Sequence, residues 1–375
     1  MEHLLLSLLF YPPVILYIVM VICFWVQWRK LPPRGDDATP PATFLSVLIP
    51  TRNERNNIAR LLERMEEQCY PGHLYEVLVI DDHSDDGTTS VIEDYLASKN
   101  SRTRLLRSAG TGKKAALLHG IGEASGRLIV TTDADCLPGR KWLRSIENFY
   151  RRENLKMVLG PVAIEPGRTL FGQMQSIEFA SLVGSGAASL GLGLPSMCNG
   201  ANLAFDRDAF IAVDGYRGTE HLASGDDEFL MHKIAHHYPG KVAFLFDPEA
   251  VVTTTPLPDW RSFARQRLRW ASKWPYYQSV APKLLAAFVF IANVCFLAAA
   301  TAALFQRLDL YIFLTLAFLK FFVEFVFLKK IVKFCGKAFN TRAYILLEFF
   351  YPIYVSFFAI CSKRGKYIWK GRKLA

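Results

Sequence analysis

Two carboxylates separated by one small residue, Asp133 and Asp135, follow the apolar run LIVTT. If that run is a strand, its backbone points alternate side chains the same way, so both carboxylates can face one cation. Hard oxygen ligands suit Mg²⁺ or Mn²⁺, and such an ion can bridge a diphosphate and neutralise it as it leaves. An Asp-x-Asp pair also occurs in polar turns and helix caps, but its place at a strand end favours a metal site.

A second pair of acids, Asp81 and Asp82, ends an earlier apolar run and leads into the sequence SDDGT. A helix cap accounts for Asp85 or Asp86. Capping does not explain two carboxylates at the strand exit, where a base or a ribose can form hydrogen bonds. These two residues are therefore candidates for binding a nucleoside.

The glycine-containing run from Gly110 to Lys114 opens a predicted helix. Its amide groups and the Lys113 ammonium can therefore meet a phosphate. The run lacks the spacing of a Walker A motif, so as a phosphate loop it is unspecific.

Three consecutive acids, Asp226, Asp227 and Glu228, precede a helix predicted over Phe229–His237. Capping explains one of them, but three adjacent carboxylates repel one another unless something uses them. Further along, the basic aromatic sequence QRLRW contains Gln266. An interfacial helix whose cationic side chains reach towards water explains that sequence as well as a functional role does, and both can hold.

These residues lie in a region where strands and helices alternate. The predicted strands are short apolar runs over 44–49, 75–80, 103–107 and 127–132, and the predicted helices cover 54–67, 88–96 and 113–123. The first helix has an apolar stripe at Ile58, Leu61, Leu62 and Met65. Such alternation implies right-handed crossovers and a mostly parallel sheet, so the fold class is α/β.

Three of the predicted strands end in polar clusters: residues 51–54, 81–86 and 133–135. Ligands of open parallel sheets bind beyond the carboxyl ends of the strands. The opposite ends carry no comparable clusters. The pattern therefore predicts one crevice that is rich in carboxylates.

Four apolar runs, over 4–26, 284–305, 310–328 and 343–360, approach or exceed the length that crosses a bilayer. The first has no basic residue before it and no small-residue cleavage site after it, so we expect a retained anchor rather than a signal peptide. Arg29, Lys30 and Arg34 follow it, and the positive-inside rule then places the soluble region in the cytosol.

The topology of the fourth run stays open, because Pro352 permits a kink or a re-entrant segment and a spanning run would leave the basic tail outside. In the third run, Lys320 and Glu324 lie one turn apart, where they pair with each other or indicate function. The expected domains are an anchor over 1–30, a linker over 31–43, a soluble domain with interfacial helices over 44–283, a transmembrane region over 284–361 and a basic tail over 362–375.

The formal net charge is +10, and much of the excess lies beside the apolar runs. Lysine and arginine at those places set orientation and meet anionic lipid, so we expect a membrane partner and no nucleic acid. The seven cysteines form no CxxC pair. This pattern fits reduced thiols in the cytosol rather than a disulfide framework or a zinc site.

The ordered motifs resemble those of the family 2 inverting glycosyltransferases, which include cellulose, chitin and hyaluronan synthases and ceramide glucosyltransferases. The resemblance covers about Ser46 to Trp274 and implies the Rossmann-like GT-A fold in a membrane-bound enzyme. The motifs, in chain order, are PTRNE, VIDDHSDDGT, GKKAAL, TTDADC, CNGANLAF, GDDEFL and QRLRW.

The resemblance also assigns roles to the matching residues. Asp227 matches the general base, although Gly225 and Asp226 stand where Thr-Glu is usual and Glu228 remains an alternative base. The residues implied to bind the donor or its metal are Thr51, Glu54, Asp81, Asp82, Lys113, Asp133 and Asp135. Those implied to close over the diphosphate and the acceptor are Gln266, Arg269 and Trp270.

The implied reaction is a direct displacement in which Asp227 deprotonates the acceptor hydroxyl and the configuration at the anomeric carbon inverts. Arg269 and Mg²⁺ or Mn²⁺ would stabilise the leaving diphosphate. We expect a nucleotide-diphosphate sugar as donor, of the UDP type, and a lipid or glycan acceptor, with the enzyme in a bacterial inner membrane and its catalytic domain in the cytosol. A processive polysaccharide synthase and a catalytically silent nucleotide-sugar-binding protein are the alternatives.

The segment from Thr169 to Leu194 carries few charges but is too short in apolar residues to span a bilayer. We expect it to lie against the membrane and help admit the acceptor. A buried core helix is the alternative.

Overall fold

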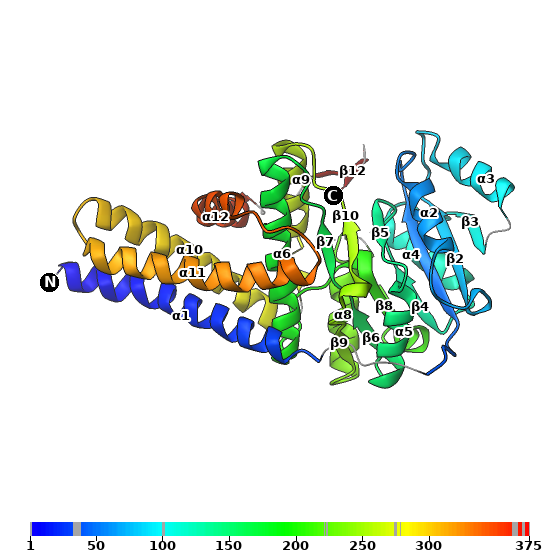
Figure 1. Ribbon diagram of the computed structural model, residues 1–375, viewed down its shortest axis with the longest axis horizontal. Coiled ribbons are helices and arrows are strands. Elements are labelled where there is room, and N and C mark those ends of the chain that lie inside the picture. Colours follow the sequence, from blue (N-terminus) through cyan, green and yellow to red (C-terminus); the bar gives the residue numbers. More distant parts are fainter. Residues whose placement is uncertain are drawn as a thin grey trace. The chain divides into compact units, whose positions relative to one another are not determined.

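The computed structural model describes residues 2–32, 39–99, 102–220, 222, 224–273, 276–277, 279–361, 367–369 and 372–374. The chain forms two compact units that interleave along the sequence, and Figure 1 traces its course. The sheet unit contains residues 31–164, 197–255 and 368–375, and the helical unit contains residues 1–30, 165–196 and 256–367. Part of the expected linker, 33–38, lies outside the described residues, as does the basic tail apart from β11 (Tyr367–Trp369) and β12 (Arg372–Leu374).

The sheet unit is built on a seven-stranded sheet with the order β3-β2-β1-β4-β8-β6-β9. Strand β1 is parallel to β2 and β4, β2 is parallel to β3, β6 is parallel to β9, and β8 runs antiparallel to β4 and β6. The mostly parallel α/β sheet predicted from the sequence is confirmed, and the antiparallel strand β8 makes it mixed. The strand bounds are β1 Leu45–Thr51, β2 Tyr75–Asp81, β3 Thr103–Arg107, β4 Leu128–Thr131, β6 Met157–Leu159, β8 Leu203–Asp206 and β9 Val242–Phe244.

Helices and a smaller sheet complete this unit. Gly120 allows α4 to approach the sheet closely, because a Cβ at that position would come within 2.8 Å of Ile80 Cδ1. The helices are α2 Ile58–Glu66, α3 Thr88–Ser98, α4 Lys113–Glu123, α5 Trp142–Arg152, α7 Arg207–Ala212 and α8 Asp226–His237, with short 3-10 turns at Gly72–Leu74, Gly200–Asn202 and Pro248–Ala250. The smaller sheet has the order β5-β10-β7, formed by Cys136–Pro138, Val252–Thr254 and Val162–Ile164.

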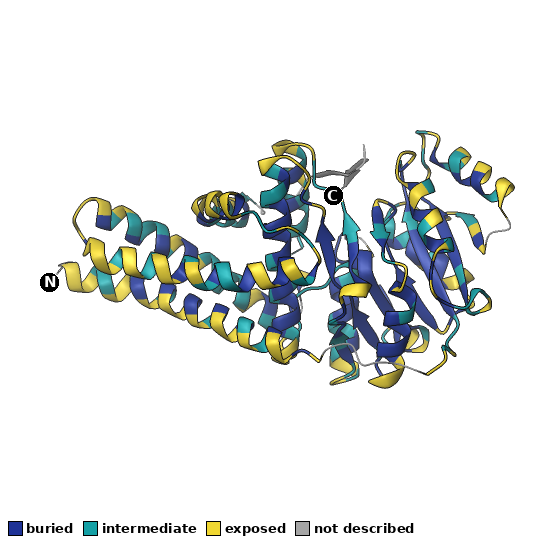
Figure 2. Ribbon diagram, viewed as in Figure 1, coloured by how far each residue is buried: buried dark blue, intermediate teal, exposed yellow. Residues whose placement is uncertain are grey.

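The helical unit contains four helices that are long and apolar enough to cross a membrane: α1 Glu2–Lys30, α10 Val280–Leu304, α11 Leu310–Phe334 and α12 Thr341–Cys361. In Figure 2 their outer surfaces are largely exposed, and many of the exposed side chains are large and apolar. Such surfaces are typical of helices that contact lipid. The long apolar helices predicted near both ends of the chain are confirmed, and each is a candidate membrane span.

The remaining helices of this unit are α6 (Leu170–Gly191) and α9 (Trp260–Ala271). Figure 1 shows α1, α10 and α11 lying lengthwise, whereas α12 is seen nearly end-on and α6 runs across their ends. Helix α6 packs against α1, α11 and α12. Many residues of α6 are buried within the helical unit. The interfacial position predicted for residues 169–194 therefore stays a prediction, beside the alternative of a buried core helix. Helix α12 continues through Pro352 without a break.

A buried polar network joins three of the apolar helices. The Lys320 ammonium donates to Glu324 Oε2 at 2.6 Å and to Glu348 Oε2 at 3.2 Å. The Tyr17 hydroxyl of α1 donates to Glu324 Oε1 at 2.6 Å. The predicted pairing of Lys320 with Glu324 is confirmed, and Glu348 adds a second carboxylate to the same cation.

Candidate active site

The carboxyl ends of β1, β2 and β4 lie side by side, because these strands are adjacent and parallel. The register pairs Thr51 directly with Asp81. Strand β4 leads straight into Asp133, and β5 begins directly after Asp135. The strand order therefore brings the three predicted polar clusters to one edge of the sheet.

At this edge, Lys113 holds the acids of two distant segments together. Its ammonium donates to Asp133 Oδ1 at 2.6 Å and lies 3.9 Å from Asp226 Oδ2. Burial alone lowers the pKa of Lys113, but Asp133, Asp226 and Asp227 together raise it above its ordinary value. The lysine is therefore a fixed positive charge among three carboxylates.

Asp226 is buried beside this lysine. Burial raises the pKa of its carboxyl, Asp227 and Asp133 raise it further, and Lys113 opposes them. The three acids lie in the first turn of α8, not before it as predicted, and the amide groups of a helix N-terminus stabilise negative charge there. The three acids of the sequence SGDDEF are therefore the first residues of the helix and do not cap it from outside.

The two aspartates of the strand-end pair form a candidate cation site. Asp133, Asp135 and Cys136 each place one potential ligand atom within 4.8 Å of the others. Burial raises the pKa of the Cys136 thiol, and Asp135 and Asp133 raise it further. The two aspartates offer carboxylate oxygens, which suit a hard divalent cation. The contact with Lys113 shows that Asp133 accommodates a positive charge.

Asp227 is half-buried and held in one orientation. Its Oδ2 accepts a hydrogen bond from the Gly200 amide at 2.8 Å, and its Oδ1 accepts one from the Glu228 amide at 2.8 Å. The Thr131 hydroxyl at the end of β4 donates to the Gly200 carbonyl at 2.7 Å. Gly200 therefore links the carboxylate of α8 to the sheet.

Gly200 was not among the predicted site residues, although the quoted motif CNGANLAF contains it. A Cβ at this position would lie 3.3 Å from Lys113 Nζ, 3.6 Å from Asp226 Oδ2 and 3.6 Å from Asp227 Cβ. The signal in the sequence was a glycine just before a strand, which indicates a close approach of the backbone to other groups.

The second polar cluster is organised by Asp81 and Asp82. Asp81 Oδ2 accepts from the Ser84 amide at 3.2 Å, and its Oδ1 is buried with no hydrogen-bond partner among the described residues. Asp82 Oδ2 accepts from the Gly112 amide at 3.0 Å, which fixes the glycine-containing run next to β2. A buried carboxylate oxygen without a hydrogen-bond partner destabilises a fold. Such an oxygen is expected where a bound ligand supplies the missing hydrogen-bond donor.

Two residues at the strand exits adopt left-handed backbone conformations, Asn53 with φ 52° and His83 with φ 54°. Such conformations are rare outside glycine and collect at functional sites. The side-chain amide of Asn53 donates to Asp85 Oδ1 at 2.8 Å, and the backbone amide of Asp85 donates to Asn53 Oδ1 at 3.0 Å. Arg52 was not predicted, yet its guanidinium donates to the carbonyls of Asp82 and His83 at 2.7 and 2.6 Å.

Thr51 and Glu54 lie at the predicted edge but are tied into the fold. The Thr51 hydroxyl is buried and donates to the Ile49 carbonyl at 3.0 Å. Glu54 Oε2 accepts from Asn57 at 2.7 Å in a turn that delays the start of α2 to Ile58. The helix predicted from Glu54 therefore began too early.

Gln266, Arg269 and Trp270 belong to α9 in the helical unit. All three side chains are half-buried. The Trp270 ring lies 6.2 Å from that of Phe179, and Gln266 accepts a hydrogen bond from Arg267. Their part in the site therefore remains a prediction.

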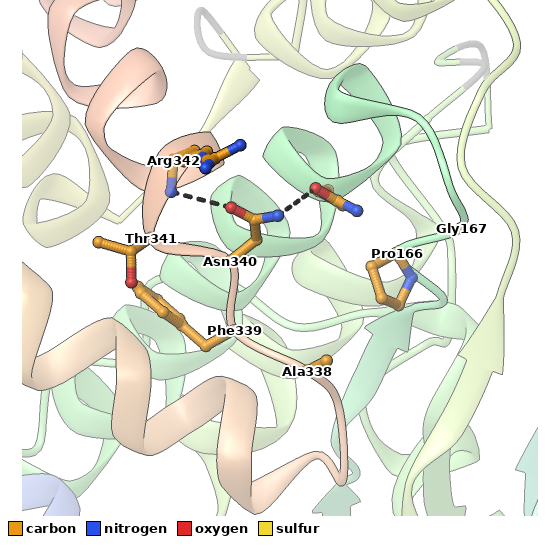
Figure 3. Close-up of a pocket in the computed structure, with 8 residues that line it drawn as sticks. Pro166, Gly167, Ala338, Phe339, Asn340, Thr341 and Arg342 are labelled. Carbon is orange, nitrogen blue, oxygen red and sulfur yellow. Dashed lines mark hydrogen bonds between the residues drawn. The ribbon is translucent and has the colours of Figure 1, made fainter.

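The helical unit also has a pocket of about 470 Å³ between the start of α6 and the loop before α12, shown in Figure 3. Asn340 lies in its wall, donates to Gln173 Oε1 at 2.7 Å and accepts from the Arg342 amide at 2.8 Å. The pocket contains none of the predicted site residues. Its lining consists of Pro166, Gly167, Gln173, Ala338, Phe339, Asn340, Thr341 and Arg342.

Comparison with known families matches residues 46–213 to the family described as Glycosyl transferase family 2. Among curated proteins, the glycosyltransferase AglE of Haloferax volcanii is 36% identical over 105 residues, which are 28% of this chain and 34% of that protein. The dodecaprenyl-phosphate galacturonate synthase of Rhizobium johnstonii is 30% identical over 138 residues, 36% of this chain and 40% of that protein. The chain thus matches about a third to two fifths of the length of these relatives.

Among solved structures, the mannosyltransferase PcManGT from Pyrobaculum calidifontis, in complex with GDP-Man and Mn²⁺, covers 96% of both chains with a TM-score of 0.58. The sequences are 19% identical, so the similarity concerns the fold. It agrees with the predicted GT-A fold.

Proposed function

Because residues 46–213 form a glycosyltransferase family 2 domain, we propose that this protein transfers a sugar from a nucleotide-diphosphate sugar to a lipid acceptor at a membrane surface. The observation that supports it best is the cluster of Lys113, Asp133, Asp226 and Asp227 at the carboxyl edge of the sheet. We also propose that the donor is a UDP-sugar and that the transfer inverts the configuration at the anomeric carbon.

In the proposed mechanism Asp227 is the general base. Its carboxylate is held by two backbone amides, so its remaining lone pairs keep a fixed direction for the acceptor proton. Asp133 and Asp135 would hold Mg²⁺ or Mn²⁺, which supplies Lewis-acid neutralisation of the departing diphosphate. Lys113 contributes a second positive charge beside them, and Asp81 and Asp82 accept hydrogen bonds from the nucleoside.

The acceptor is proposed to be a lipid, and the relative named as a dodecaprenyl-phosphate galacturonate synthase supports a lipid that ends in a phosphate. Four candidate spans among the described residues also favour a lipid over a growing polymer, because a translocation path needs several helices around a polar channel. Retention of all the predicted acids argues against a silent nucleotide-sugar-binding protein. The positive-inside pattern supports a cytosolic catalytic domain in a bacterial inner membrane.

Membranes containing the protein, incubated with a panel of radiolabelled nucleotide-sugars, test the proposal. Label from one donor should enter the fraction soluble in organic solvent. Label that enters only an insoluble polymer would instead support a processive synthase, and no incorporation from any donor would support a silent binding protein.

A further inference from the structure

A buried ion pair fastens α9 to its neighbours within the helical unit. Arg267 Nε donates to Glu178 Oε1 of α6 at 3.0 Å, and Arg267 Nη2 pairs with Glu178 Oε2. Only 5% of the Arg267 side chain and 3% of the Glu178 side chain are exposed. Two parallel contacts between a guanidinium and a carboxylate fix the orientation of both groups, not only their distance.

The carboxylate also receives a hydrogen bond from a third helix. The Tyr354 hydroxyl of α12 donates to Glu178 Oε1 at 2.8 Å, and the Tyr354 ring lies 5.9 Å from that of Phe263 in α9. Three helices therefore meet at one carboxylate. A charged pair in so buried a place is retained only when its hydrogen bonds are well satisfied, as they are here.

The guanidinium of Arg267 is held between two rings of its own helix. Its carbon lies 4.4 Å from the centre of the Phe263 ring and 4.3 Å from the centre of the Trp270 ring. It also donates to Gln266 Oε1. With its oxygen occupied in this way, the Gln266 amide can offer N–H donors to a ligand that accepts hydrogen bonds, such as a phosphate or a sugar hydroxyl.

We propose that Glu178 and Tyr354 are positioning residues that act through Arg267 to fix Gln266 and Trp270 for sugar transfer. This inference rests on the proposed function. Neither residue was predicted, because they lie in α6 and α12, far in the sequence from the QRLRW segment. Through them, the orientation of α9 depends on two other helices of the helical unit.

Replacing Glu178 with Gln keeps the size of the side chain but removes the charge that holds Arg267. We expect kcat to fall about tenfold while the KM for the donor changes less than about threefold, because the groups are displaced from the transition state more than from the bound donor. Tyr354→Phe should lower kcat by a smaller factor. Glu165→Gln is the matched control, since Glu165 also belongs to the helical unit but pairs with Lys337.

A double-mutant cycle with Gln266→Ala separates positioning from general support of the fold. If Glu178 acts through Gln266, Glu178→Gln should reduce kcat much less in the Gln266→Ala background than in the wild type. Full additivity of the two effects would overturn the proposal.

Hydrogen exchange measured on the purified full-length protein gives a test that needs no activity. Glu178→Gln should speed amide exchange in residues 262–271 of α9, and Glu165→Gln should not. Unchanged exchange in α9 would overturn the inference even if sugar transfer is found. Faster exchange without transfer from any donor would support this role in fixing α9 and count against the proposed function.

Discussion

At the scale of single residues, one ammonium group organises the proposed site. Lys113 contacts Asp133 directly and lies near Asp226, so the cluster holds three acids around one fixed cation. Removal of a carboxylate should therefore affect charge balance and ligand binding more than the fold.

Asp135 provides the first prediction. Asp135→Asn should remove most sugar transfer and Mn²⁺ binding while the protein stays folded, because the side chain is exposed and has a ligand role in the proposal. Metal binding can be measured by titration and folding by circular dichroism. Asp94→Asn, an exposed aspartate on α3, is the control. Full activity in excess chelator would contradict a metal role.

The general base provides the second prediction. Asp227→Asn should abolish transfer but leave donor binding nearly unchanged, because the base acts on the acceptor. Glu228→Gln should retain transfer, provided its unfolding temperature shows that the buried side chain has not weakened the fold. Normal turnover by Asp227→Asn together with an inactive, folded Glu228→Gln would move the base to Glu228.

The third prediction concerns the space around Gly200. Gly200→Ala should push the flexible Lys113 ammonium away from its place and lower kcat about tenfold, equivalent to ~1.4 kcal/mol, with little change in unfolding temperature. Gly122→Ala is the control, since a Cβ at that position would meet no described atom within 4 Å and alanine favours a helix. Equal activity of the two variants would show that the cluster tolerates a methyl group.

Most of the acids at this edge could be predicted, because strand ends are visible as apolar runs that stop at polar residues. The support given by Gly200 and Arg52 could not, because it depends on backbone groups brought together by the fold. Contacts to backbone carbonyl and amide groups are hard to predict from the sequence, because almost every residue type carries these groups.

At the scale of elements, the predictions succeeded where periodicity was strong. The strand Thr103–Arg107 and the helix Lys113–Glu123 have the predicted bounds. Helix boundaries near the site were wrong for α2 and α8, because a turn bonded through Glu54 delays one helix and the acids of the other lie inside its first turn. The network of Glu178 and Arg267 was hidden because periodicity says nothing about partners on distant helices.

The buried network of α11 provides the fourth prediction. Lys320→Met should destabilise the purified protein by about 3 to 5 kcal/mol, because it leaves the carboxylates of Glu324 and Glu348 buried without their cation. Adding Glu324→Gln and Glu348→Gln to that variant should restore much of the lost stability. The measurement is thermal or denaturant unfolding in detergent.

Lys330→Met provides the control, because Lys330 lies on the same helix but is exposed. It should leave stability nearly unchanged. If Lys320→Met is no less stable than Lys330→Met, the buried pairing contributes nothing measurable to the helical unit.

At the scale of the whole molecule, two units share the proposed functional residues. The acids lie in the sheet unit, and the QRLRW segment lies in the helical unit among helices suited to a membrane. The α/β fold and the transmembrane helices could be predicted from local patterns. The interleaving of the two units could not be predicted, because the helices that pack against α6 and α9 lie far from them along the chain.

The most direct test of the central claim is sugar transfer by purified protein in vesicles that contain a polyprenyl phosphate, with vesicles of the matching polyprenol as control. The wild type should convert a radiolabelled nucleotide-sugar into a labelled lipid soluble in organic solvent, only with a divalent cation and the phosphate-bearing lipid, and Asp227→Asn should not. Donor binding without any labelled lipid, or label found only in a polymer, would contradict the account.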